Sequence, residues 1–176
     1  MKYSRPASVM RSLVGGLARF AYTECHFQVA DAEEEWNVSD EFDLIHGRAL
    51  MSCFNDPRVI LRHTFKAVKP GCYLEIQDNF FPLQFAGPTP TKSALYKWSE
   101  IVASGGAKSE RPWTNLQHYK RWMEEIGFQD VVKMGFYTPT GPWAKGEYYK
   151  LIERYFNANL RFGFPAASWK VMGALG

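Results

Sequence analysis

The pattern of residues 41–77 predicts a strand, a helix and a second strand, and this order restricts the fold more than any other feature of the chain. Glu41–His46 is a short, largely apolar run that is typical of a buried strand. Asp56-Pro57 suits the cap and first position of a helix, and Pro70-Gly71 is a sharp stop directly after its predicted last residue, Lys69. Cys72–Gln77 predicts the next strand. A unit of this kind normally makes its two strands parallel neighbours in one sheet.

Further elements are expected on both sides of this unit. Cys25–Ala30 alternates β-formers and predicts a short strand, followed by an acidic turn. Glycines are expected to end the first two of the later helices, at Gly105-Gly106 and Gly127. The later part of the chain predicts helices over 92–104, 116–126, 147–162 and 168–175, a strand over 129–137 and a turn over 139–143. We therefore expect one α/β domain over residues 25–176, preceded by a basic leader over residues 1–24.

Composition excludes several classes of protein. The net charge of +3 is too small to indicate a nucleic-acid or membrane partner, and no apolar run is long enough to span a membrane. The three cysteines lack metal-ligand spacing, so no metal site is expected, and reduced thiols favour a cytoplasmic location, with the nucleus as an alternative. The leader is basic and its residues 1–23 contain no acid, which fits a surface helix or an irregular segment better than a mitochondrial presequence.

The candidate site residues follow the predicted strands, because ligands of open α/β sheets bind at the carboxyl ends of the strands. These residues are Asp31-Ala32, His46-Gly47-Arg48 and Gln77-Asp78-Asn79. A carboxylate such as that of Asp31 can accept a hydrogen bond from the amine of an adenine, and a neighbouring backbone N–H can donate to a ring nitrogen. Trp36 could cover the flat face of a base. The sequence thus favours a nucleoside-binding edge.

Each of these residues has a structural alternative. Asp31 also suits a solvated acidic turn at a helix N-terminus, and Trp36 suits packing. His46 at the end of a buried strand could be a satisfied core histidine, and Arg48 could pair with the acidic cluster. The residue types alone leave both interpretations open.

Three motifs in this order resemble the second half of a class I S-adenosylmethionine (SAM) methyltransferase, and more narrowly the fungal LaeA-like methyltransferase family. The motifs are Phe27-Gln-Val-Ala-Asp-Ala-Glu-Glu-Glu-Trp36, Phe42-Asp-Leu-Ile-His-Gly-Arg48 and Val68-Lys-Pro-Gly-Cys-Tyr-Leu-Glu75. Gly127-Phe-Gln-Asp-Val131 and the turn at Gly141-Pro-Trp143 are also similar to that family. The resemblance covers about residues 26–175. It implies an incomplete Rossmann-like class I methyltransferase sheet of parallel strands with helices, and a helical lid region.

The resemblance also implies a set of roles. SAM would be the cofactor, contacted by Asp31, Ala32, Trp36, Gly47 and Arg48, and His46 would be the catalytic residue facing the substrate. The substrate would be a small molecule methylated on oxygen or nitrogen in fungal secondary metabolism. Because methyl transfer from a sulfonium mostly requires positioning, few acid–base groups are needed.

The sequence departs from the family pattern at the N-terminal side. The Gly-rich G-x-G-x-G turn that holds the methionine part of SAM is absent, and Gly15-Gly16 does not follow a convincing strand. We therefore expect a domain truncated at both ends relative to the family. This leaves open a catalytically inactive remnant, an interaction or regulatory module, or a leader read from the wrong exon. An open sheet edge would also favour a homo- or hetero-oligomer.

Overall fold

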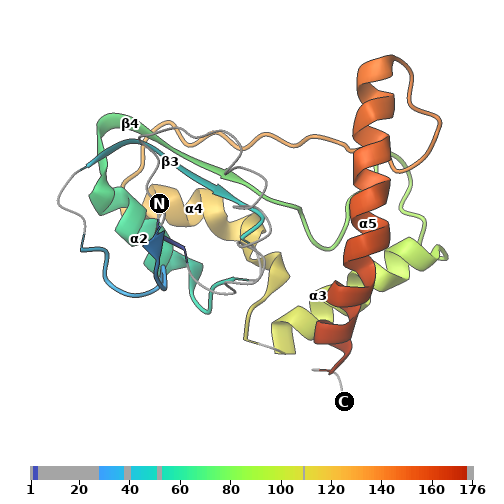
Figure 1. The fold of residues 1–176 in the computed structure, drawn as a ribbon, viewed down its shortest axis with the longest axis horizontal. Coiled ribbons are helices and arrows are strands. Elements are labelled where there is room, and N and C mark those ends of the chain that lie inside the picture. The colour runs from blue at the N-terminus through green and yellow to red at the C-terminus, as the bar shows by residue number, and fades with distance from the viewer. Residues whose placement is uncertain (1, 4–27, 38–40, 51–52, 109, 174–176) are drawn as a thin grey trace. The chain divides into compact units, whose positions relative to one another are not determined.

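The computed structural model describes residues 2–3, 28–37, 41–50, 53–108 and 110–173 (Figure 1). The chain divides into two compact units. The first unit comprises Met1–Asp78 and Arg121–Gln129, and the second unit comprises Asn79–Lys120 and Asp130–Gly176. We describe each unit by itself.

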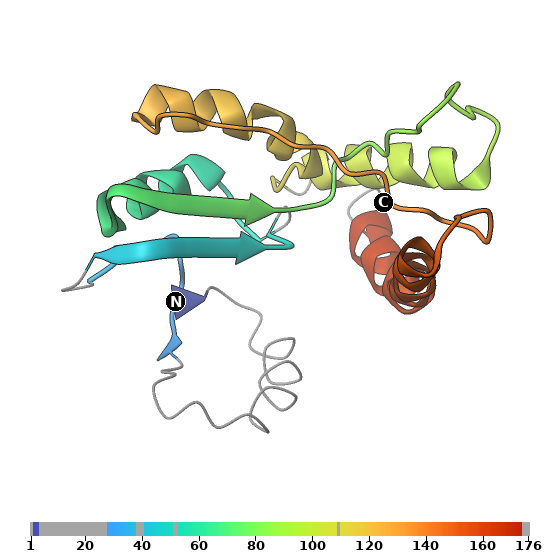
Figure 2. The same ribbon diagram turned by 90° about the horizontal axis from the view of Figure 1, so that it is seen from above.

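The first unit is built on two parallel strands, β3 (Phe42–Arg48) and β4 (Val68–Gln77), which lie side by side in Figure 2. The helix α2 (Pro57–Ala67) connects them and packs on one face of the pair. The predicted strand–helix–strand unit and its parallel pairing are therefore confirmed. The α/β fold class, with parallel strands and helices, is confirmed with it.

A second parallel pair lies in the same unit. It joins β1 (Lys2–Tyr3) to β2 (Gln28–Val29), so part of the strand predicted over residues 25–30 is present. Residues 25–27 lie outside the described residues, and so does the leader apart from Lys2 and Tyr3. The division into leader and single domain stays a prediction.

The start of α2 follows from its sequence. Asp56 has extended backbone and its Oδ1 accepts a hydrogen bond from the Arg58 N–H at 3.0 Å, while Pro57 occupies the first turn. The helix ends at Ala67, two residues before the predicted end. The reason is that Val68 already has extended backbone and pairs with Phe42, so β4 begins before Pro70.

The second unit is mainly helical. It contains α3 (Ala94–Lys108), the 3₁₀ helix η1 (Trp113–His118) and α5 (Glu147–Gly173). The helix α4 (Tyr119–Ile126) follows η1 directly and passes into the first unit, where Gly127 ends it with a φ of 120° as predicted. Trp113 is buried and its ring packs edge-on against Phe81, at a centroid distance of 5.1 Å. These aromatic contacts form the core of the second unit.

Three predictions for this region are wrong. The helix α3 continues through Gly105-Gly106, because both glycines are buried in its packing. The predicted helices over 147–162 and 168–175 form one helix, α5, which carries Pro165 within it. The strand predicted over residues 129–137 is absent from the described structure, and its Val132, Met134 and Phe136 side chains are exposed.

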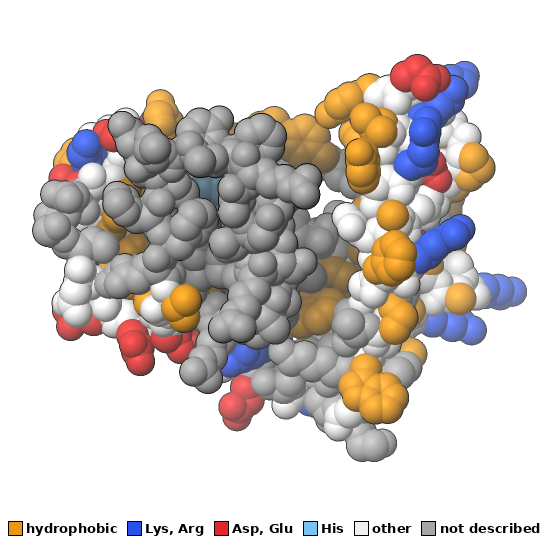
Figure 3. Space-filling view, viewed as in Figure 1, with side chains coloured by type: hydrophobic (Ala, Val, Ile, Leu, Met, Phe, Trp, Pro, Cys, Tyr) orange, Lys and Arg blue, Asp and Glu red, His pale blue; other side chains and the backbone are white. Residues whose placement is uncertain are grey.

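The helix α5 presents many apolar side chains to solvent. Tyr155, Phe162 and Trp169 are each at least 66% exposed, and Figure 3 shows hydrophobic groups along its length. It contacts α3, where the Trp98 Nε1–H donates to Ser168 Oγ at 2.8 Å. The roles of these helices as a lid, and of an oligomer in covering the sheet edge, stay predictions.

Candidate nucleoside-binding edge

The carboxyl ends of β3 and β4 are tied together by two hydrogen bonds. The Ala49 N–H donates to the Gln77 carbonyl at 3.0 Å, and the Leu50 N–H donates to Asp78 Oδ2 at 2.7 Å. Ala49 adopts a left-handed φ of 55°, which turns the chain out of β3. Asp78, a candidate from the sequence, thus fixes the turn after the neighbouring strand.

The acidic segment Asp31–Trp36 is held against the start of α2. The Glu33 carboxylate accepts from the Asn55 and Asp56 N–H groups, both at 2.9 Å, and from Asn55 Nδ2 at 3.0 Å. Asp31 Oδ1 accepts from the Glu33 N–H at 2.9 Å. Glu33 therefore has a structural role: it joins the acidic segment to the start of α2, where a carboxylate is favoured by the positive end of the helix.

Ala32 and Trp36 connect this segment to a small core. Ala32 is buried together with Phe54 and Ile60, and Leu50 packs against the same cluster. The Ala32 carbonyl accepts from Trp36 Nε1–H at 2.9 Å. The Trp36 ring is half-buried and packs on this cluster, which fits the packing interpretation. Together these contacts bring the segment after β2 to the carboxyl end of β3, forming what we call the strand-end edge (residues 31–36, 49–50, 53–56 and 78).

The segment His46-Gly47-Arg48 lies within β3, so the expectation that it follows the strand is wrong. The strand continues because these residues pair with Glu75, Ile76 and Gln77 of β4. Their side chains alternate between the two faces of the pair.

Gly47 lies on the buried face. A Cβ there would stand 2.6 Å from Leu50 Cδ1, so a larger residue would require the Leu50 side chain to shift. Arg48 lies on the other face and is exposed, and within the described residues its side chain makes no ion pair. The cofactor roles of Gly47 and Arg48 stay predictions.

His46 pairs with a residue that the sequence did not single out. Its Nδ1 lies 2.9 Å from Glu75 Oε2, and both side chains are partly exposed. A hydrogen bond from Gln77, and to a smaller extent one from His46, lowers the pKa of Glu75, so the carboxylate stays charged at neutral pH. Neither Glu75 nor Glu33 could be found from the sequence, because each contact depends on how distant segments align.

The structure thus brings together Asp31, Ala32, Trp36 and Asp78 at the strand-end edge. His46 and Arg48 lie on the more exposed face of the β3–β4 pair, and in the described part of the chain no hydrogen bond joins either of them to Asp31. Among the same residues no cluster of potential metal ligands is found. No described helix has the length and hydropathy that a membrane span requires.

The acidic segment offers a hydrogen-bond acceptor of the kind that an adenine amine would need. Asp31 is exposed and only its Oδ1 has a hydrogen bond to a described residue, which leaves Oδ2 as an acceptor for an amine. Glu33, in contrast, is fully engaged by the start of α2. The described residues therefore leave one carboxylate oxygen of Asp31 available as an acceptor.

Comparisons with known proteins identify the family of this chain. Residues 19–133 match the family described as a methyltransferase domain. The "Probable methyltransferase tdiE" of Emericella nidulans is 29% identical over 67% of this chain and 37% of its own length. "Methyltransferase pytC" of Aspergillus terreus is 26% identical over 72% of this chain and 39% of its own length.

A regulator is also similar. The "Secondary metabolism regulator LAE1" of Cochliobolus heterostrophus is 25% identical over 79% of this chain and 46% of its own length. The chain thus spans less than half the length of these curated relatives. No solved structure matches. The family match covers more than half of the chain, and so the chain belongs to the methyltransferase domain family, with fungal relatives of the LaeA type.

Proposed function

We propose that this chain is a SAM-dependent methyltransferase-like protein that methylates an oxygen or nitrogen atom of a small molecule in fungal secondary metabolism. The observation that carries this proposal is the junction of the acidic segment with the carboxyl ends of the parallel strands, within a methyltransferase domain. SAM brings an already activated methyl group, so the protein must chiefly hold the cofactor and the acceptor in line.

Asp31 is the residue that best suits the adenine. Its Oδ2 would accept from the adenine amine, with the Ala32 backbone beside it and Trp36 flanking the base. Gly47 and Arg48 would contribute from β3. Cys53 and Cys72 are present as thiols, which suits a reducing compartment such as the cytoplasm.

The test is the affinity of the full chain for S-adenosylhomocysteine, measured by isothermal titration calorimetry. Asp31→Ala removes a charged acceptor and should weaken binding about tenfold or more. Glu34→Ala is the matched control, because Glu34 is exposed and its carboxylate has no described partner, and it should change the affinity less than twofold. Absence of binding at millimolar ligand would refute the proposal.

His46 is the residue proposed to face the substrate. With Glu75 accepting from Nδ1–H, the ring presents Nε2 as an acceptor for a proton of the substrate. The ring ¹⁵N chemical shifts of His46 should then show the Nδ1–H tautomer, and Glu75→Gln should raise the population of the other tautomer. An unchanged tautomer ratio in Glu75→Gln would contradict this arrangement.

A second candidate function is a non-catalytic regulatory module. It is favoured by the exposed apolar side chains of residues 132–137 and by the similarity to relatives named as regulators. A folded chain that does not bind S-adenosylhomocysteine would support this alternative.

A further inference from the structure

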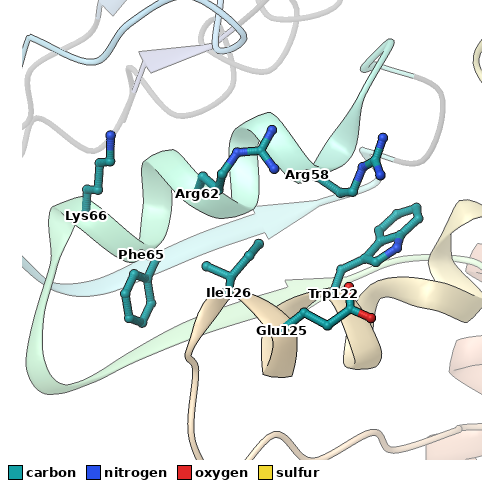
Figure 4. Close-up of a pocket in the computed structure, with 7 residues that line it drawn as sticks. All are labelled: Arg58, Arg62, Phe65, Lys66, Trp122, Glu125 and Ile126. Carbon is teal, nitrogen blue, oxygen red and sulfur yellow. The ribbon is translucent and has the colours of Figure 1, made fainter.

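A groove lies between α2 and α4 within the first unit, and none of the residues that line it belongs to the strand-end edge. Its volume is about 480 Å³. It is lined by Arg58, Arg62, Phe65 and Lys66 from α2 and by Trp122, Glu125 and Ile126 from α4. Figure 4 shows Phe65 and Ile126 facing one another across it, with Trp122 directed toward the Arg58 end of α2.

The floor of the groove is apolar and aromatic. Phe65 is 40% exposed although its ring packs edge-on against Phe128, at a centroid distance of 4.9 Å. Trp122 and Ile126 are half-buried. A floor of this composition resembles the central part of protein interfaces, where aromatic residues and arginine are enriched.

One wall of the groove carries a row of basic side chains. Arg58, Arg62 and Lys66 are spaced four residues apart, so they share one face of α2 about 6 Å from each other along the axis. Arg58 is neutralised and fixed, because its guanidinium binds both oxygens of Asp56 and stands 5.7 Å from the centre of the Trp122 ring. Arg62 and Lys66 make no ion pair within the described residues.

The single acid of the groove does not balance this charge. Glu125 lies 3.5 Å from the Arg121 guanidinium, one turn earlier on α4. In the described structure Arg62 and Lys66 therefore make no direct ion pair, next to an exposed apolar floor.

We propose that this groove binds an acidic amphipathic helix of a partner protein. Carboxylates four residues apart on such a helix would meet Arg62 and Lys66, and an apolar side chain between them would enter the space between Phe65, Ile126 and Trp122. A small molecule fits less well, because five of the seven lining residues are exposed and could not enclose most of its surface. Electrostatic attraction to the basic row gives specificity for acidic partners.

The experiment uses the full chain and a labelled helical peptide with glutamates four residues apart on both sides of one leucine. Fluorescence anisotropy should show saturable binding that weakens at least tenfold in Arg62→Glu/Lys66→Glu. The matched control is Lys92→Glu/Lys97→Glu, which makes the same charge change at exposed positions of the second unit and should alter the affinity less than twofold. Higher salt should weaken binding to the wild type.

Thermal unfolding of both double variants should match the wild type, since all four side chains are exposed. The proposal is overturned by lack of binding at millimolar peptide, by equal weakening in the control, or by equal affinity for a peptide with glutamine in place of glutamate. Stronger binding of a 12-nucleotide single-stranded DNA would also overturn it. S-adenosylhomocysteine affinity should not change in Arg62→Glu/Lys66→Glu, so this result is independent of the proposed function.

Discussion

Gly106 has no side chain at a point where one would disturb the core of the second unit. A Cβ at this position would stand 2.8 Å from Trp113 Cδ1, and both residues are buried. The glycine therefore serves close packing between α3 and η1 rather than the end of α3. This accounts for the failure of the sequence-based helix boundary, which treated glycine only as a helix breaker.

A pair of glycine-to-alanine variants tests this explanation. Gly106→Ala should lower the free energy of unfolding by about 1–3 kcal/mol, because Trp113 must move to accommodate the methyl group. Gly163→Ala is the control, since Gly163 lies in α5 and a methyl group there would meet no atom within 4 Å. It should raise stability by about 0.5–1 kcal/mol through helix propensity. Urea denaturation measures both changes, and a loss of equal size in the two variants would contradict the explanation.

At the scale of elements, α2 is fixed at its N-terminus by two carboxylates from different segments. Asp56 is the N-cap residue, and its carboxylate accepts a hydrogen bond from the Arg58 N–H. The Glu33 carboxylate accepts from the N–H groups of Asn55 and Asp56, directly before the helix. The hydrogen bond from Arg58 lowers the pKa of Asp56 below its ordinary value of 3.8. The folded chain therefore favours the ionised form of Asp56 more than the unfolded chain does.

The pH dependence of stability follows from this difference. Because the pKa of Asp56 is lowered on folding, its contribution is fully present above about pH 4 and is lost as the pH falls through the lower, folded value. Asp56→Ala should cost about 1 kcal/mol at pH 7, through loss of the cap. Asp56→Asn keeps a capping group without the charge, so its deficit relative to wild type should shrink in acid. Chemical denaturation from pH 7 to pH 2.5 measures this, and a deficit independent of pH would disprove the assignment.

How far the sequence predicts each element depends on how local its signals are. The start of α2 and the parallel pairing of β3 and β4 depend on Asp56-Pro57 and on the short connection, and both are confirmed. The strand predicted over residues 129–137 is absent from the described structure. A strand requires a partner strand to hydrogen-bond with, and an alternating pattern of apolar residues does not show whether one is present. Likewise, the contact of His46 with Glu75 depends on strand register, which local pattern does not fix.

At the scale of the whole molecule, the chain contains two compact units. It spans less than half the length of the curated relatives that it matches. The strand-end edge and the groove between α2 and α4 both belong to the first unit, on separate sets of residues. Cofactor binding and partner binding can therefore be measured separately on the same chain. Loss of one should leave the other intact.

The role of the strand-end edge can be tested without measuring catalysis, by finding which residues of the chain respond to S-adenosylhomocysteine, the product that SAM leaves after methyl transfer. The full ¹⁵N-labelled chain would be titrated with S-adenosylhomocysteine and followed by amide chemical shifts in nuclear magnetic resonance spectra. We predict saturable shifts at residues 31–36, at Ala49 and Leu50, and at Asp78, where the strand-end edge is assembled. Shifts confined to α3 and α5, or no shifts at millimolar ligand, would contradict a nucleoside site at this edge.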